Sequence, residues 1–199
     1  MHDADSQMLI LLWFILPVWL IAGFCDWLCH RATGIERTTG VKETLIHMLM
    51  FLEMSLPLLA ALFLEVNALI IAFMIVMFFL HEMTALWDVS YAATARNITP
   101  LEQHIHSFLE MLPLMALLLI ISRHWNEFLS LFGLSDVAAS FDISLRADPL
   151  PVTYIVVIFS GIILLELLPY LEEYFRGRRY QKKRSTGAQG KFRMSDRFR

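Results

Sequence analysis

Three side chains that can bind a metal or transfer protons recur at intervals of four within residues 96–113. They are Glu102, His106 and Glu110. At about 100° per residue, side chains four apart share one face of a helix. Carboxylates and imidazoles are ligands for iron, manganese and zinc, and they also act as general acids and bases. The stripe therefore predicts a metal-binding or acid–base site.

Residues 37–57 repeat this pattern, in the order Arg, Glu, His, Phe-Leu-Glu-Met and Pro. Arg37, Glu43 and His47 are spaced as in the later stretch, with six residues from Arg to Glu and four from Glu to His. Beyond the histidine the two copies differ, because two extra residues separate His47 from Glu53. The repeat predicts two similar helical hairpins, each contributing to one site.

The rest of the sequence predicts the helices that would hold these residues. Of the 199 residues, 57% are hydrophobic and only 18% are charged, which is far more apolar than a soluble domain. A helix needs about 20 apolar residues to cross a hydrocarbon core. We therefore predict an all-α polytopic membrane protein with five transmembrane helices: residues 8–29, 44–64, 67–92, 101–122 and 152–170.

The repeat also predicts how these helices are organised. We expect the first four to form an antiparallel four-helix bundle from two repeated hairpins, and the fifth, which has no counterpart in the repeat, to be an addition. The predicted parts are the bundle at 1–122 (hairpins 8–64 and 67–122), an outside interfacial segment at 123–151, the fifth helix at 152–175, and a basic, disordered cytoplasmic tail at 176–199.

Basic residues predict the orientation in the membrane. Ten of the 16 Lys and Arg residues follow Phe175, and positive charge favours the cytoplasmic side. With five spans, the C-terminus is then cytoplasmic and the N-terminus outside. We expect an integral protein of a bacterial inner membrane that contacts bilayer lipid and has no nucleic-acid partner. The sequence leaves the oligomeric state open.

Acidic residues and histidines within membrane spans are costly unless they face a partner or water, so they usually mark function. Ten such residues lie toward the cytoplasmic ends of the first four spans: Asp26, His30, Glu43, His47, Glu53, His81, Asp88, Glu102, His106 and Glu110. No Lys or Arg is interspersed with them in the spans, so we predict that metal cations supply the positive charge and that these ten residues surround them. The ligands exceed what one ion needs. We predict two metal ions, iron first, with zinc or manganese as alternatives.

This arrangement resembles the ferritin-like di-iron carboxylate proteins. Two helices of that four-helix bundle each give a Glu, and the other two each give a Glu and a His one turn away. Six residues here match that set: Asp26, Glu43, His47, Asp88, Glu102 and His106. The resemblance covers the first four spans, although the spacing is Glu-x-x-x-His and the single carboxylates are Asp. It implies a di-iron oxidoreductase that acts on a lipid, quinone or other apolar substrate.

Other functions stay open on the same residues. With zinc, a bound water would hydrolyse a lipid, and Glu53 or Glu110 would be the catalytic base. A b-type haem protein would use two histidines such as His47 and His106, but would leave the carboxylates without a purpose. A metal transporter would need polar residues in the outer halves of the spans, which are almost purely apolar. A structural protein would use the polar cluster only to join the helices.

His104 is an alternative to His106 as the histidine of the second repeat. It lies six residues before Glu110, the spacing of His47 and Glu53 in the first repeat. However, His104 and His106 are about 160° apart around a helix. We favour His106, because it shares one narrow stripe with Glu102 and Glu110.

Overall fold

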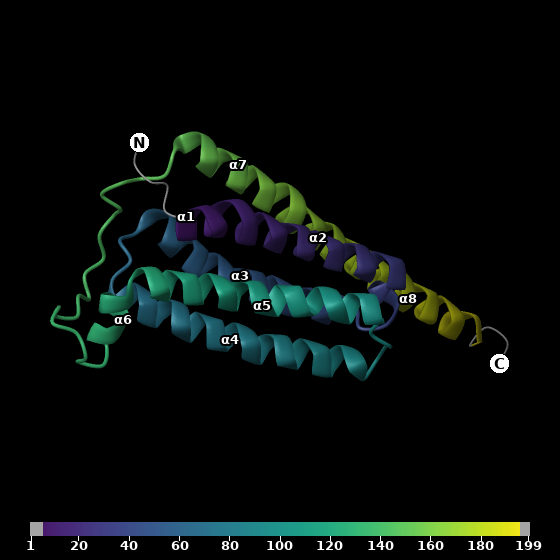
Figure 1. Cartoon of the computed structure of the whole chain (residues 1–199). Helices are drawn as coiled ribbons and strands as arrows, with labels where there is room; N and C mark the ends of the chain where they lie inside the picture. The colour runs from purple at the N-terminus through teal and green to yellow at the C-terminus, as the bar shows by residue number, and fades with distance from the viewer. Residues whose placement is uncertain (1–5, 196–199) are drawn as a thin grey trace.

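The computed structural model describes residues 6–195, with side chains through residue 186 (Figure 1). The first span comprises α1 (Ser6–Ile10), the π-helix η1 (Leu11–Ile15) and α2 (Leu16–Thr33). Three more spans follow: α3 (Val41–Phe63), α4 (Ala68–Ala93) and α5 (Pro100–Arg123). The fifth consists of α7 (Val152–Ile162), the π-helix η3 (Ile163–Leu167) and α8 (Leu168–Ser195). The short helices η2 (Ile35–Arg37) and α6 (Trp125–Ser130) lie between spans.

Within the described residues, five helices are long and apolar enough to cross a membrane, which confirms the predicted all-α polytopic fold. The first four spans form the antiparallel bundle (Figure 1). Within it α2 packs along α5, α3 packs along α4, and α4 contacts α5. The fifth span lies against the first hairpin, because η3 contacts α2 and α8 contacts both α2 and α3. The half of this span that contains η3 and the start of α8 therefore borders the bundle interior.

Local sequence explains the ends of the helices that carry the site. Thr99 and Glu102 form a reciprocal capping box at the start of α5, with Pro100 in the first turn. Gly34 ends α2 in the left-handed conformation, with φ of 66°, which costs glycine little because it has no Cβ. These caps place Glu102 and His30 at the same end of the bundle.

The two ends of the bundle are closed differently. Short connections, residues 34–40 and 94–99, join the spans at one end of the bundle, which we call the inner end; the opposite end is the outer end. At the outer end, residues 144–146 pair with the end of α3: the Glu65 N–H donates to Ser144 at 2.9 Å, and the Arg146 N–H donates to Phe63 at 3.0 Å. This pairing holds the long segment after α6 over the outer end.

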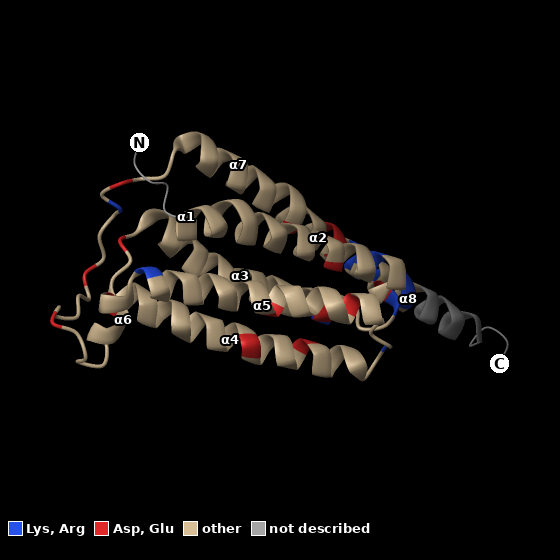
Figure 2. Ribbon diagram, in the orientation of Figure 1, with Lys and Arg blue, Asp and Glu red and all other residues tan. Residues whose placement is uncertain are grey.

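The C-terminal segment differs from the expectation of a disordered tail. Helix α8 continues from the fifth span through Ser195, because Gln181, Lys182 and Lys183 favour helix and no proline follows Pro169. The basic residues from Arg176 to Arg184 thus lie on a helix that extends from the inner end of the bundle (Figures 1 and 2).

Candidate metal centre

The spans bring most of the predicted ligands together in the inner half of the bundle. Figure 2 shows the acidic residues of α2, α4 and α5 in the half nearer α8. Seven of the ten predicted residues are buried there within one polar cluster: Asp26, His30, Glu43, His47, Asp88, Glu102 and His106. Each of the first four spans contributes at least one of them.

The histidines of the repeat face aspartates of the opposite hairpin. His106 Nε2 on α5 lies 2.9 Å from Asp26 Oδ1 on α2. His47 Nε2 on α3 lies 3.1 Å from Asp88 Oδ2 on α4. The two contacts are equivalent under the sequence repeat, so the cluster has an approximate twofold arrangement that the duplicated motif produces.

His30 departs from that symmetry and lies between the two halves. Its Nε2 is 3.4 Å from both Asp26 Oδ2 and Glu102 Oε1. Its ring stacks on that of His47 with a centroid distance of 4.6 Å. Among the described residues, two overlapping groups could hold a metal ion, because the ligand atoms within each group lie within 4.8 Å of one another. The first group is Asp26, His30, Glu102 and His106, and the second is His30, Glu43 and His47.

The close contacts in this cluster fit shared metal ligands better than hydrogen bonds. His30 Nε2 and His47 Nε2 are buried and have no hydrogen-bond partner within the described chain, although carboxylate oxygens lie 3.4 Å and 3.1 Å away. At a metal–ligand distance of about 2.1 Å, neighbouring ligand atoms are about 3.0–3.4 Å apart. Nitrogen and oxygen donors in this mixture suit iron, manganese or zinc. The residues present therefore fit a metal.

The expectation that no basic side chain accompanies the acids is wrong, because Arg96 enters the cluster. Its guanidinium binds Glu43 and Glu102 together, with Nη1 2.9 Å from Glu102 Oε2 and Nε 3.2 Å from Glu43 Oε1. Burial alone would lower the pKa of Arg96, but hydrogen bonds to Glu102 and Glu43 raise this pKa, so the guanidinium stays charged. Arg96 reaches them from the loop between α4 and α5.

Arg96 does not balance all the negative charge. Seven carboxyl residues are buried within the described chain: Asp26, Glu43, Glu53, Asp88, Glu102, Glu166 and Glu173. Arg176 adds a second guanidinium at the edge of the cluster, 3.9 Å from Glu173. The remaining charge has to be met by protons on the carboxyl groups and imidazoles or by bound cations.

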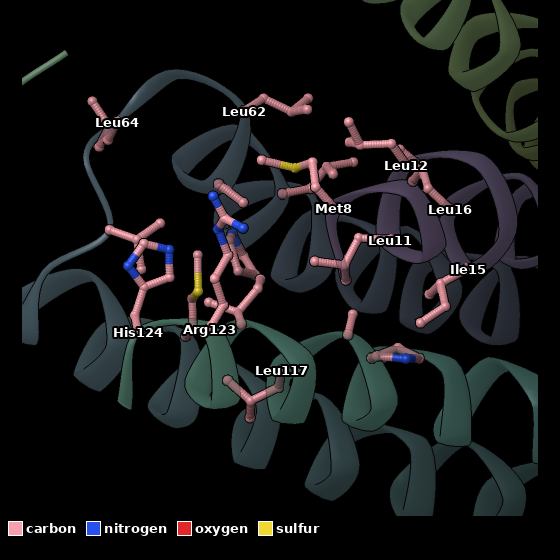
Figure 3. Close-up of a pocket in the computed structure, with 18 of the residues that line it drawn as sticks. Met8, Leu11, Leu12, Ile15, Leu16, Leu62, Leu64, Leu117, Arg123 and His124 are labelled. Atoms are coloured by element: carbon pink, nitrogen blue, oxygen red, sulfur yellow. The ribbon is translucent and has the colours of Figure 1, made fainter. Parts of the chain in front are cut away.

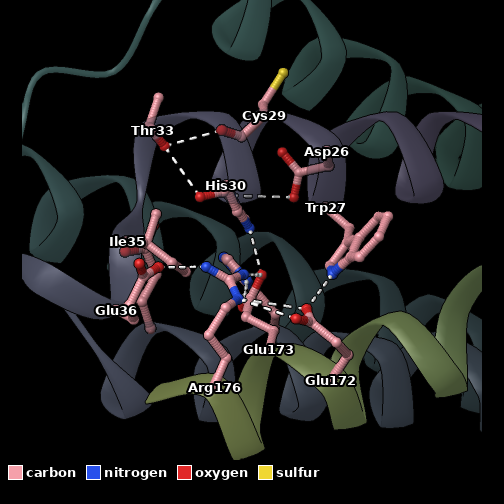
Figure 4. A network of polar contacts seen from close by, with 12 residues as sticks. Asp26, Trp27, Cys29, His30, Thr33, Ile35, Glu36, Glu172, Glu173 and Arg176 are labelled. Carbon is pink, nitrogen blue, oxygen red and sulfur yellow. Dashed lines mark hydrogen bonds and ion pairs between the residues drawn. The ribbon is translucent and has the colours of Figure 1, made fainter. Parts of the chain in front are cut away.

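Glu173 on α8 is a functional candidate that the repeat-based prediction missed. Its Oε2 lies 3.2 Å from His30 Nδ1, and its Oε1 lies 3.8 Å from His47 Nδ1. Figure 4 shows Glu173 between His30 and Arg176. A carboxylate behind a metal-binding histidine fixes the ring and the tautomer. One signal was available, since Glu166 and Glu173 are seven residues apart and share a helix face.

We expect Glu173→Gln to weaken metal binding by about 10–100-fold, because outer partners of metal-binding histidines typically contribute that much. The measurement is a competition titration with a chelator of known affinity. Glu172→Gln is the matched control, since Glu172 pairs with Trp27 and Arg31 at the surface of the cluster. Equal metal affinity in the Glu173→Gln and control proteins would exclude this positioning role.

The three remaining predicted residues lie deeper in the bundle than the cluster. Glu53 accepts a hydrogen bond from the Thr84 hydroxyl at 2.9 Å. His81 and Glu110 line a small cavity of about 50 Å³, together with His47, His106, Asp26, Asp88, Glu166 and Tyr170. Of the two predicted catalytic bases, Glu110 borders this space, and Glu53 is not among its lining residues.

The structure separates His106 from His104. His106 is buried against Asp26, whereas His104 is exposed and its ring contacts Phe108 on the outer face of α5. This is the arrangement expected from the stripe of Glu102, His106 and Glu110.

No family model, no curated protein and no solved structure matches the chain.

Proposed function

We propose that this chain is a membrane-embedded carboxylate–histidine metalloprotein that binds two iron ions and oxidises an apolar substrate such as a lipid or a quinone. The observation that carries the proposal is the set of buried imidazole nitrogens of His30 and His47 that face carboxylates without hydrogen bonding to them. Asp26, Glu102 and His106 would hold one ion, and Glu43, His47 and Asp88 the other. His30 would lie between them.

The chain's own residues prepare the site. Glu173 orients His30 from behind through its contact with Nδ1 and also lies 3.8 Å from His47 Nδ1. Arg96 holds the Glu43 and Glu102 carboxylates together at the inner end. The surrounding apolar spans exclude bulk water, which strengthens each of these interactions. As in the ferritin-like di-iron proteins that the motif resembles, bound iron would supply the electrons that activate O2.

The geometry disfavours two of the other functions. The rings of His30 and His47 stack at 4.6 Å, and the cavity beside His47 and His106 measures only about 50 Å³, which leaves no room for a porphyrin between histidines. The acidic residues of α2, α4 and α5 are confined to the inner half of the bundle (Figure 2), so the outer halves of these spans offer no carboxylate to a cation that would cross the membrane.

The oxidase proposal is tested by loading the metal-free protein with Fe(II) without oxygen and then adding O2. We expect O2 to be consumed in proportion to the loaded protein, with an iron absorbance change that the His47→Ala protein lacks. A haem absorption band in the protein as purified would overturn the proposal. Activity restored by zinc alone toward a lipid ester would favour hydrolysis, with Glu110 beside the cavity as the base.

We infer that the inner end of the bundle faces the cytoplasm of a bacterial inner membrane, since Arg31, Arg37 and Arg96 lie at that end with the basic helix α8. A green fluorescent protein fused after Arg199 is expected to fluoresce, while alkaline phosphatase fused there is expected to be inactive. A fusion of each reporter to the segment 131–151 is the control and should give the opposite pair of results. Active phosphatase at the C-terminus would reverse the orientation.

A further inference from the structure

A second, larger cavity lies in the outer half of the bundle. It has a volume of about 340 Å³ and is lined by residues of the first four spans and of the outer segment. Its walls within the bundle are apolar and include Leu11, Ile15, Leu16 and Leu117, which Figure 3 shows around the space. A volume above 300 Å³ with mainly apolar walls and a few polar groups is typical of a ligand pocket.

The polar groups of this cavity are gathered at its outer end: Glu65, Arg123, His124, Arg146 and Asp148. Figure 3 shows Arg123 and His124 at one side of the space and Ile15 and Leu16 at the other. Burial and the charge of Arg123 lower the pKa of His124, which favours the neutral form of its ring. Arg146 is held in place by donating from Nη1 to the Ala61 carbonyl at 3.2 Å. The cavity thus has one polar end and an apolar interior.

The opposite end of the cavity borders the metal centre. Trp19 lines both this cavity and the small one beside His47 and His106. Three other wall residues are close sequence neighbours of the deep predicted residues: Met54 beside Glu53, Phe78 one turn before His81, and Leu112 two residues after Glu110. Of the polar groups at the outer end, none lines the small cavity.

We propose that this cavity binds the hydrocarbon chain of a single-chain acyl lipid. The acyl head lies at the outer end by Arg123 and Arg146, and the chain runs inward so that its far end meets Trp19. An apolar chain with one polar end matches the distribution of the wall residues, because the polar groups lie at the end that residues 144–148 cover. The idea that the bound lipid is the substrate of the metal centre rests on the proposed function. The binding of the lipid in this cavity does not depend on that function.

The binding is tested with palmitic acid and its monoacylglycerol, each carrying a diazirine near the far end of the chain. After irradiation of the purified full-length protein, we expect adducts on Trp19, Met54 or Phe78 that excess palmitic acid removes. Ala116→Trp fills the cavity from α5 and should lose the adducts. Leu118→Trp, two residues on and 54% exposed, should keep them.

The two lipids distinguish a free acid from an ester, since preference for one of them identifies the head that the outer end accepts. Adducts confined to lipid-facing residues such as Leu118, or unchanged in the Ala116→Trp protein, would overturn the proposal. Protein stripped of metal with a chelator is labelled in parallel. Labelling that persists in the metal-free protein supports the lipid site even if the proposed metal function is wrong. If the protein binds metal but is not labelled, the lipid site is overturned and the metal centre is not affected.

Discussion

Replacing Arg96 by alanine is expected to lower the free energy of unfolding by about 3–5 kcal/mol, the usual effect of removing one partner from a buried ion pair. Glu43 and Glu102 have fully buried side chains, and the Arg96 side chain is only 5% exposed. Without the guanidinium, two carboxylates at the inner end of the bundle would face each other. The measurement is the unfolding transition of the purified protein in detergent, followed by circular dichroism.

Arg37 provides the matched control for this experiment. It occupies the same place in the first repeat as Arg96 in the second, six residues before a glutamate. Its side chain is 72% exposed and lies beside Glu36. Arg37→Ala should therefore change stability by less than about 0.5 kcal/mol. If the two variants unfold alike, Arg96 is not the counter-charge of Glu43 and Glu102.

Replacing His47 or His106 by alanine is expected to weaken metal binding by at least about 100-fold, because losing even an outer partner of a metal ligand costs about 10–100-fold. Both imidazoles are buried against an aspartate of the opposite hairpin. Alanine leaves that aspartate without its neighbour and removes one donor from the cluster. The measurement is metal content by elemental analysis after dialysis against a weak chelator.

His104→Ala and His124→Ala are the controls for the histidine variants. His104 lies on the exposed face of the helix that carries His106, and His124 lies at the outer end of α5, away from the cluster. Both should retain the metal content of the unaltered protein. If the His47→Ala and His106→Ala proteins retain their full metal content, the metal is bound elsewhere.

The fold was predictable because the hydropathy and the length of each apolar segment can be read directly from the sequence. Each span is a continuous apolar run that a membrane requires, and the repeated Arg, Glu and His order predicts paired hairpins. The C-terminal segment was not predictable in the same way. Charge density past Phe175 favours an unstructured tail, but the same residues are good helix formers that extend a helix already nucleated in the fifth span.

The site residues were predictable only where they lie together on one face of a single helix. Glu102 and His106 share such a face, and so do Glu43 and His47. Arg96 could not be predicted, because Arg37 occupies the same sequence position and is exposed; only the path of the loop selects between them. Glu173 was missed because it comes from a helix outside the repeat, and its meeting with His30 depends on how the fifth span packs.

The approximate symmetry of the cluster also explains why two ions are proposed. Each half offers a histidine, an aspartate and a glutamate from the two hairpins, and His30 and Glu173 join the halves at their centre. Protonated imidazoles could balance the same charge without metal. They would then have to donate hydrogen bonds, which His47 does not form with either ring nitrogen in the described structure.

The most direct test is the metal content of protein purified from its membrane without added metal. The proposed centre predicts about two iron ions per chain, no haem band, and a loss of stability when a strong chelator removes the ions. Protein that contains no metal, and whose unfolding transition is the same with and without chelator, would contradict it.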